Sequence, residues 1–367
     1  MEKAIKPQFT KSNAVAEAAF QQLRKDVNLL ITQLEPFRRK NIVFKALLFP
    51  LLYIATYTSL LEWGRNDWVF YSSYFMLGVT LVMIFLNTIH DAVHGTIFKQ
   101  KWANEIYVYF FDLMGANSYV WRLRHVRFHH NYPNVEGWDT DIEQSSLARI
   151  FPTGKVSPFH KYQHIYLPLL YPLYLFNWLL LRDFKDFFNK RKTIWKLVNI
   201  PRKEYMKLFV FKAAFLFYLL VIPHWVLSVV WLKIITGFLL MLFTASIFSL
   251  MVLLSPHANT DSEFPVPDEL NKLPHNWMMH MLTTTNDVSH DNWFTRFFMG
   301  SFNFHVVHHL FPNVNHVYYP EITGLLQQYA RQYGLPYRQY SLRVSLSNHF
   351  RLLKQNGATE NIFEETM

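Results

Sequence analysis

The sequence predicts an all-α integral membrane protein with four transmembrane helices, arranged as two hairpins, and a cytosolic helical lobe. Three observations support this fold class. Only 17% of the 367 residues are charged, against roughly a quarter in an average soluble domain, and 51% are apolar. Two pairs of apolar runs are long enough to cross a bilayer. Three clusters of histidine lie in the polar sequence between and after these pairs.

The apolar runs define the expected hairpins. Residues 1–41 are polar and charged and are expected to form a cytosolic N-terminal segment. The first hairpin, 42–89, contains apolar runs at 42–61 and 69–88 that flank a short polar turn. The second, 208–254, is too long for one crossing and suits two helices of about 21 residues. Four transmembrane helices follow.

Two parts of the chain are expected outside the bilayer. Residues 90–207 form a cytosolic loop with two histidine clusters and interfacial helices, and residues 255–367 form a C-terminal lobe with the third cluster. The run at 165–181 is apolar but contains Pro168 and Pro172. We therefore expect it at the membrane interface, or as a helix buried against the lobe.

The distribution of basic residues predicts the orientation in the membrane. The formal net charge is +10, and Lys and Arg concentrate before the first run, in the central loop and after the last run. The two hairpin turns hold only Arg65 and Lys233. By the positive-inside rule, both termini and the central loop face the cytosol. Because these basic residues follow the membrane ends, we expect contact with membrane lipids and no nucleic-acid partner.

Three histidine clusters predict a metal site. They read His90-Asp-Ala-Val-His94, His125-Val-Arg-Phe-His129-His130 and His305-Val-Val-His308-His309. On an α-helix, residues three or four apart share one face, so each cluster can supply two or three ligands from that face. The chain has no cysteine, so any metal must be held by imidazole or oxygen. Eight imidazoles exceed the ligands of one ion, and the lobe is expected to hold a dinuclear site.

The ligand type favours redox chemistry on a lipid-soluble substrate. Hydrolytic dinuclear sites usually recruit bridging carboxylates, and the clusters contain only Asp91. Breaking an unactivated methylene C–H bond needs an oxidant that side chains do not provide, so metal-activated dioxygen would have to supply it. A transport or non-catalytic metal-binding protein is a competing hypothesis. No row of charged residues along the apolar runs supports an ion path.

Three segments around the clusters resemble a known family. They are 87–95 (NTIHDAVHG), 124–141 (RHVRFHHNYPNVEGWDTD) and 303–319 (NFHVVHHLFPNVNHVYY). These segments are similar to the membrane fatty acid desaturases, above all to bacterial front-end, linoleoyl-CoA-type members. The resemblance implies two iron ions that use dioxygen to introduce a cis double bond into a fatty acyl chain, carried by coenzyme A or by a lipid. It also implies a long acyl tunnel and a multi-pass protein of the bacterial inner membrane.

One departure keeps a second activity open. Front-end desaturases commonly carry glutamine at the first position of the third cluster, where this chain has His305. A hydroxylase or ketolase of the same superfamily, acting on a lipid or a carotenoid, is therefore the alternative. The resemblance implies no catalytic side chain beyond the metal centre.

The resemblance also implies a ninth ligand between the fourth run and the third cluster, four residues after an asparagine that reaches an ion through water. Asn276 and His280 fit this spacing, whereas His257 is expected to be an interfacial group. The expected ligands are His90, His94, His125, His129, His130, His280, His305, His308 and His309. The expected outer contacts to these ligands are Asn276, Asp91, Asp139, Asp141 and Asn303.

Two further expectations concern partners. Arg122, Arg124 and Arg127 flank the second cluster and are candidates for binding a lipid or coenzyme A phosphate, although the basic bias of cytosolic loops explains them equally well. The sequence has no His-Pro-Gly-Gly haem motif. Electrons are therefore expected from a separate ferredoxin or cytochrome b5.

Overall fold

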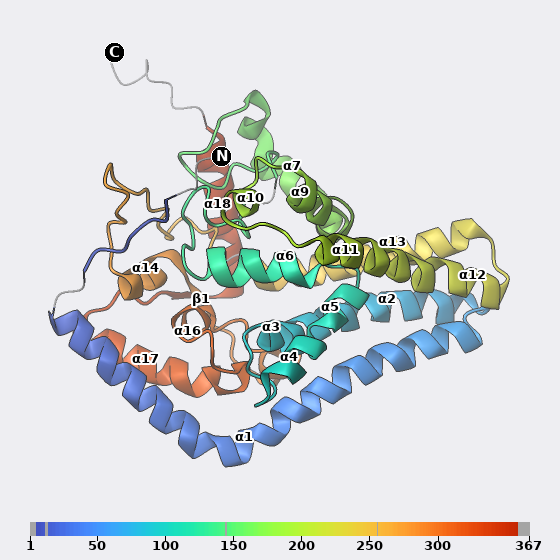
Figure 1. The fold of residues 1–367 in the computed structure, drawn as a ribbon, viewed down its shortest axis with the longest axis horizontal. Helices are drawn as coiled ribbons and strands as arrows, with labels where there is room; N and C mark the ends of the chain where they lie inside the picture. Colours follow the sequence, from blue (N-terminus) through green and yellow to red (C-terminus); the bar gives the residue numbers. More distant parts are fainter. Residues whose placement is uncertain (1–4, 12–13, 144, 255, 359–367) are drawn as a thin grey trace.

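Apolar sequence forms five long helical stretches in the computed structural model, which describes residues 5–11, 14–143, 145–254 and 256–358 (Figure 1). Each stretch is long and apolar enough to cross a membrane. Their bounds are Glu17–Trp63, Asp67–Val93, Pro158–Trp195, Arg202–Leu227 and Trp231–Leu253. The helical class is confirmed, and the described residues contain one such stretch more than the four transmembrane helices that the sequence predicts.

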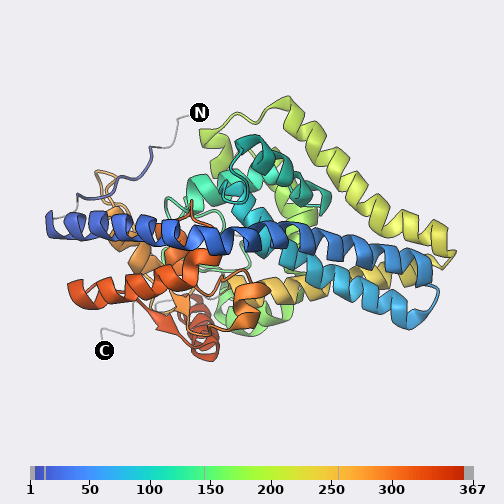
Figure 2. The same cartoon turned by 90° about the horizontal axis from the view of Figure 1, so that it is seen from below.

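Helix α1 (Ala14–Trp63) runs the length of the molecule. It contains Pro36 and Pro50, and Figure 1 shows that it bends, as expected where proline removes a backbone hydrogen bond. Its first part lies along α17 (Tyr319–Tyr333) and its second part along α2 (Asp67–Ile84), as Figures 1 and 2 both show. The N-terminal segment is therefore continuous with the first apolar helix.

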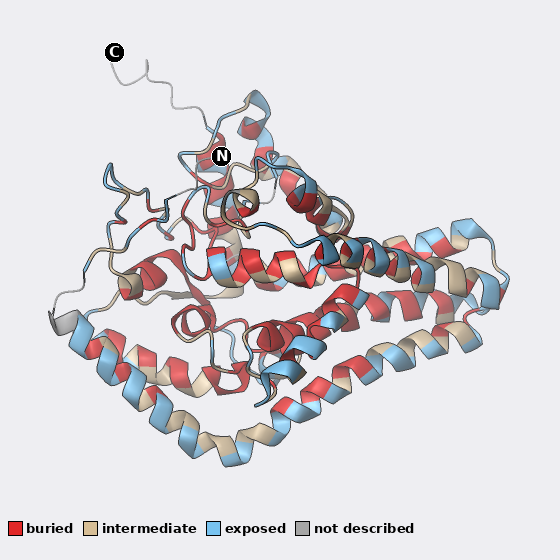
Figure 3. Cartoon of the chain, viewed as in Figure 1, coloured by how far each residue is buried: buried red, intermediate tan, exposed pale blue. Residues whose placement is uncertain are grey.

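The stem is built around the contact between α2 and α13 (Trp231–Leu253). A Cβ atom on Gly78 of α2 would lie 2.4 Å from the Met241 carbonyl oxygen, so only glycine permits this close approach. The outer faces of the stem helices are exposed (Figure 3). They carry large apolar side chains such as Phe75, Leu232 and Ile247. A helix that is apolar on its outward face too is typical of a membrane span.

The second hairpin is completed by three segments that precede α13, and its turn contains Ser228 in the left-handed conformation. These segments are α11 (Arg202–Leu216), η6 (Phe217–Val221) and α12 (Ile222–Leu227).

The stretch at 158–195 is not one regular helix. It alternates between 3₁₀, α and π geometry and contains Pro168 and Pro172. Its segments are η3 (Pro158–Tyr162), α7 (Gln163–Leu170), η4 (Tyr171–Leu173), α8 (Tyr174–Phe176), η5 (Asn177–Arg182), α9 (Asp183–Phe188) and α10 (Thr193–Leu197).

The lobe is made of short helices at one end of the stem (Figure 1). From the end of α2 to residue 129 these are η1 (Phe85–Ile89), α3 (His90–Val93), α4 (Lys101–Tyr107), α5 (Tyr109–Leu113), α6 (Ser118–Arg122) and η2 (Leu123–His129). In the C-terminal part they are α14 (Trp277–Thr284), α15 (Trp293–Phe297), α16 (His305–Leu310), η7 (His316–Tyr318), α17 and α18 (Leu342–Gly357).

The only strands among the described residues are β1 (Asp287–Val288) and β2 (Gln339–Tyr340), which pair in parallel. Their register places Asp287 opposite Gln339. This short pair joins the segment before α16 to the segment before α18, and so it helps to fix the third histidine cluster within the lobe.

Candidate metal centre

Four segments that are distant in sequence bring nine histidines together inside the lobe. One ring comes from the start of α3 and one from the residue after it, and three come from η2 and the residue that follows. Helix α16 supplies three more, and the ninth follows the end of α13. Within the described residues, their ring nitrogens form two groups whose ligand atoms lie within 4.8 Å of one another. The sequence predicts eight of these nine residues.

The first group contains five histidines, His90, His94, His125, His130 and His308. The Nε2 atom of His90 lies 3.1 Å from Nε2 of His125 and 3.1 Å from Nε2 of His308. The Nε2 atoms of His125 and His130 are also 3.1 Å apart. Two nitrogens bound to one ion at about 2.1 Å and at right angles lie about 3.0 Å apart. The spacing of this group therefore fits a shared octahedral ion.

The second group contains four histidines, His129, His257, His305 and His309. The Nε2 atoms of His257 and His305 are 2.8 Å apart. The ring of His129 packs edge-on against the rings of His257 and His309, with centroids 4.5 Å and 4.9 Å away. Four converging imidazoles fit a second ion.

Local helix geometry divides the clusters between the groups. In η2 the His130 amide donates to the carbonyl oxygen of His125, five residues back, at 2.9 Å. This π-helical turn places the rings of His125 and His130 together and sends His129 to the other group. The second cluster therefore does not serve one ion from one face, which regular α-helical spacing predicts, whereas His90 and His94 of the first cluster do share one group.

Helix α16 divides the third cluster in the same way, but with ordinary α geometry. His305 and His309, four residues apart, belong to the second group, and His308 belongs to the first.

Burial favours the neutral, metal-binding form of most of these imidazoles. Burial, reinforced by the neighbouring histidines, lowers the pKa of His125, His130 and His308 well below its usual value. Burial likewise lowers the pKa of His257 to about 3. At His129 burial also acts to lower the pKa, but the charge and hydrogen bond of Asp139 outweigh it and raise the pKa. Neutral imidazole is the ligand form of histidine.

Unpartnered nitrogens give a direct test of whether the groups suit metal. Both ring nitrogens of His309 and Nε2 of His94 are buried and have no hydrogen-bond partner within the described residues. A buried polar atom without a partner is costly, and a coordinated cation would satisfy one lone pair on each of these rings. The two groups consist only of histidine, and imidazole suits iron, zinc, copper and nickel. The residues present therefore fit a pair of iron ions.

Outer partners orient the rings. His125 donates from Nδ1 to Asp141 at 3.0 Å, and His129 donates from Nδ1 to Asp139 at 2.9 Å. Because a carboxylate only accepts, each proton sits on Nδ1 and each Nε2 lone pair faces its group. The Nδ1 atom of His257 donates to the Thr284 carbonyl oxygen at 3.2 Å.

Two further rings have outer partners near Nδ1, but these partners are at longer distances. The Nδ1 atom of His308 lies 3.1 Å from the Tyr319 hydroxyl, and that of His90 lies 3.7 Å from Asp91. The sequence predicts Asp91, Asp139 and Asp141 as outer contacts. The sequence does not predict the contact of Thr284, because its backbone carbonyl oxygen is the acceptor. It does not predict that of Tyr319 either, because this residue lies on another helix.

The predicted pair Asn276 and His280 lies outside both groups. His280 donates from Nε2 to the Pro133 carbonyl oxygen at 3.0 Å, and its ring packs edge-on against Phe9. Asn276 caps α14 by accepting from the Met279 amide at 3.0 Å. The structure instead places His257 in the second group, where the sequence predicts an interfacial residue.

The remaining predicted site residues have varied surroundings. Asn303 is buried, and neither polar atom of its side chain has a hydrogen-bond partner within the described residues. Arg122 pairs with Glu105 at 2.7 Å, and Arg127 is exposed. Arg124 is fully buried and pairs with Asp186. Its guanidinium is therefore not accessible to a phosphate group.

An apolar cavity of about 490 Å³ leads to both histidine groups. Its walls include His90 and His125 of the first group and His129, His257 and His305 of the second. Apolar side chains from the irregular stretch at 158–195 and from the end of α13 form a large part of the remaining walls, and residues 142–150 add others. The volume lies within the roughly 300–1,000 Å³ of small-molecule pockets.

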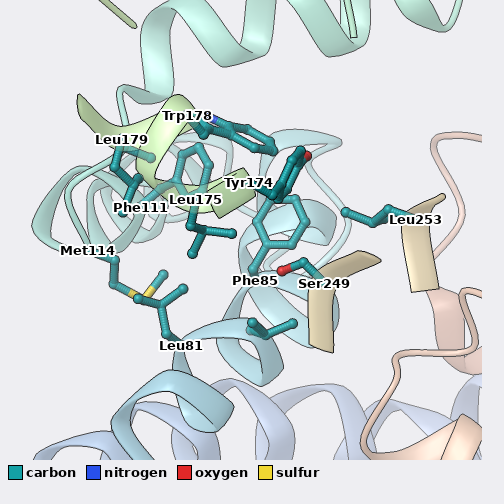
Figure 4. A pocket seen from close by; sticks show the side chains of 12 residues that line it. Leu81, Phe85, Phe111, Met114, Tyr174, Leu175, Trp178, Leu179, Ser249 and Leu253 are labelled. Atoms are coloured by element: carbon teal, nitrogen blue, oxygen red, sulfur yellow. The ribbon is translucent and has the colours of Figure 1, made fainter. Parts of the chain in front are cut away.

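Figure 4 shows a smaller apolar pocket of about 30 Å³. It lies next to the large cavity. Four side chains line both spaces and so form a partition between them. They are Phe85, Tyr174, Trp178 and Leu253.

The family model and the following three relatives that match this chain are all fatty acid or acyl-lipid desaturases. The sequence model of the family Fatty acid desaturase matches residues 66–341. The chain is 30% identical over 342 residues to the acyl-lipid (8-3)-desaturase of Physcomitrium patens, covering 89% of this chain and 69% of the relative. It is 28% identical to the sn-1 linoleoyl-lipid 6-desaturase of Arthrospira platensis, covering 71% of each. It is 27% identical to the Delta(5) fatty acid desaturase A of Dictyostelium discoideum, covering 88% of this chain and 69% of the relative.

Proposed function

This chain belongs to the fatty acid desaturase family, and on that basis we propose that its two histidine groups hold the two iron ions of an acyl desaturase. The predicted activity, an oxidoreductase acting on fatty acyl chains, is confirmed by the family match and the relatives. The observation that carries the proposal is the meeting of both histidine groups at one apolar cavity. An acyl chain in this cavity would lie against both metal sites.

We assign the ligands by the two groups. The first ion is held by the five histidines of the first group, and the second ion by the four histidines of the second. This set includes His257 and omits His280. The Nδ1 contacts of His125 and His129 with carboxylates support the assignment, because metal-ligating histidines usually donate their other ring proton in this way.

When bound, the two iron ions and dioxygen supply an oxidant that can remove two hydrogens from adjacent methylenes, with two electrons and two protons completing the reduction of dioxygen to water. The protein binds the chain, aligns it and excludes water. Phe85 and Phe302 line the cavity beside its histidines and are buried apolar rings. They are suited to keep the reacting carbons dry and fixed relative to the ligands.

We propose four transmembrane helices, with both termini and the histidines on the cytosolic side. The first group joins His90 and His125, which precede the stretch at 158–195, to His308, which follows it. If that stretch crossed the membrane alone, the bilayer would separate these residues. Its prolines and changes of helix geometry also favour a position at the interface. A bacterial inner membrane is the proposed location.

We propose an acyl-lipid as substrate. Two relatives named above are an acyl-lipid and a linoleoyl-lipid desaturase. The burial of Arg124 among carboxylates also leaves fewer cations near the second cluster for the phosphates of coenzyme A. Electrons are proposed to come from a separate ferredoxin or cytochrome b5.

Expression in a host of known lipid composition tests this function. A new double bond lowers the mass of an acyl chain by about 2 units, whereas hydroxylation raises it by about 16. We expect the first product from the wild type, and none from the variants His94→Ala, His129→Ala and His308→Ala in equal amounts of membrane protein. His275→Ala is the control, because His275 lies outside both groups and pairs with Glu263. Full activity in all three variants would refute the proposal.

A further inference from the structure

A buried lysine interrupts the apolar part of α1. Lys45 lies in the long apolar stretch Glu17–Trp63, and only 5% of it is exposed. A charged side chain within a membrane helix is costly, and it usually marks a functional contact with a definable partner. Within the described residues no carboxylate contacts the Lys45 ammonium directly, so the groups that do contact it indicate its role.

Three acceptors surround the Lys45 ammonium. Its Nζ atom donates to the Asn87 side-chain oxygen at 2.9 Å and to the Arg296 carbonyl oxygen at 2.7 Å. The third contact, at 2.9 Å, is Nε2 of His316. An ammonium group has three donors and no acceptor. His316 therefore accepts at Nε2, and its own proton lies on Nδ1.

The Nδ1 proton of His316 points at a carboxylate. His316 donates to Oδ2 of Asp91 at 2.5 Å, and Asn315 donates to the same oxygen at 2.7 Å. The other oxygen of Asp91 lies 3.7 Å from Nδ1 of His90. Lys45, His316, Asp91 and His90 thus form one buried chain of polar contacts that ends at the first histidine group.

We propose that Lys45 and His316 are positioning residues for His90. They balance the charge of Asp91 and hold its carboxylate so that one oxygen faces Nδ1 of His90. This keeps the proton of His90 on Nδ1 and directs its Nε2 lone pair towards His125 and His308. The inference rests on the proposed function, because it gives His90 the role of an iron ligand.

The contact between Asp91 and its histidine differs from the contacts that the other two carboxylates make. His125 and His129 contact Asp141 and Asp139 within 3.0 Å. Asp91 is farther from its histidine, and its closest contacts are with His316 and Asn315. Its orientation therefore depends on Lys45 of α1, which is far from the clusters in sequence, and on His316 of η7, which follows the third cluster by seven residues.

Metal binding tests the proposal without relying on turnover. Metal-depleted protein in detergent is titrated with Co²⁺, whose visible absorption reports each occupied site. We expect Lys45→Met and His316→Leu to weaken binding at one of the two sites by about 10–100-fold, the usual cost of losing an outer partner. Binding at the other site stays unchanged, because neither residue contacts the second histidine group.

A conservative variant separates positioning from packing. In His316→Gln the amide can donate to Asp91 and its oxygen can accept from Lys45, so we expect Co²⁺ affinity within a few-fold of the wild type. His316→Asn is one methylene shorter and cannot span both partners, so we expect it to resemble His316→Leu. It also serves as the polar test if His316→Leu does not fold.

The matched control is Arg38→Met. Arg38 lies on α1 as well and ties it to the C-terminal lobe through Glu321, but it contacts no histidine. We expect it to bind both Co²⁺ ions with wild-type affinity. Unchanged Co²⁺ affinity in Lys45→Met and His316→Asn would overturn the positioning role and leave the proposed function intact. Failure of the wild type to bind two ions would instead overturn the proposed function.

Discussion

His125 and His130 lie five residues apart, and their Nε2 atoms are 3.1 Å from each other because a π-helical turn joins them. His129, between them in sequence, contacts His257 and His309 instead. Adjacent residues of one cluster thus face two different metal sites.

This division predicts that neighbouring substitutions affect different ions. We expect His130→Ala to weaken metal binding in the first group only, and His129→Ala in the second group only, because each removes one ligand from one group. Co²⁺ titration of the two variants, followed by absorption, measures both sites. Loss of the same site in both variants would show that the cluster serves one ion.

The ninth ligand is tested by a second pair of variants. His257→Ala is expected to reduce desaturation by at least about 100-fold, because it removes a ligand from the group of four. His280→Gln is expected to retain most activity, because the amide can still donate to the Pro133 carbonyl oxygen. Product formation per unit of membrane protein is the measurement. The opposite order would restore His280 as the ligand.

The partition between the two apolar spaces predicts chain-length selectivity. Leu253→Ala would open the main cavity into the small pocket, whereas Leu253→Phe would narrow it. A methylene in an apolar pocket changes specificity by about 10-fold or more. We expect the ratio of longer to shorter acyl chains desaturated to rise by about 10-fold in the first variant and to fall in the second. An unchanged ratio in both would place the end of the chain elsewhere.

Acid stability is expected to depend on His349. Burial lowers the pKa of His349 to about 4, while its Nδ1 donates to the Ala258 carbonyl oxygen and its Nε2 contacts the Tyr171 hydroxyl. Between pH 6.5 and 4 the unfolded chain binds a proton at this residue and the folded protein does not. Stability therefore falls as the pH falls through this window, by about 3 kcal/mol in total.

The thermal midpoint of the wild type and of His349→Gln, followed from pH 7 to pH 4 in detergent, isolates this contribution. The variant is expected to lose less stability on acidification, because it has no group to protonate. Parallel curves for the two proteins would rule out the contribution of His349.

The sequence predicts much of this architecture because its main signals are local. Apolar length marks the stem, and spacing of three or four residues marks His90, His94 and the histidines of α16. The π-helical turn at His125–His130 is not encoded in that spacing, so the division between two groups is visible only in the structure.

Long-range contacts account for what the sequence does not reveal. His257 is a lone histidine after α13, and it belongs to the second group through contacts with His129, His305 and His309, which are all distant from it in sequence. His280 has the expected spacing from Asn276, but its ring nitrogen bonds to the backbone of Pro133 and does not reach either histidine group. Lys45 and His316 are 271 residues apart and share no motif.

Anomalous diffraction at the iron edge, from crystals of protein produced with iron, would locate both ions directly. We expect two iron peaks per chain, one among the ring nitrogens of His90, His94, His125, His130 and His308 and one among those of His129, His257, His305 and His309. A single peak, or a peak beside His280 with none beside His257, would contradict this expectation.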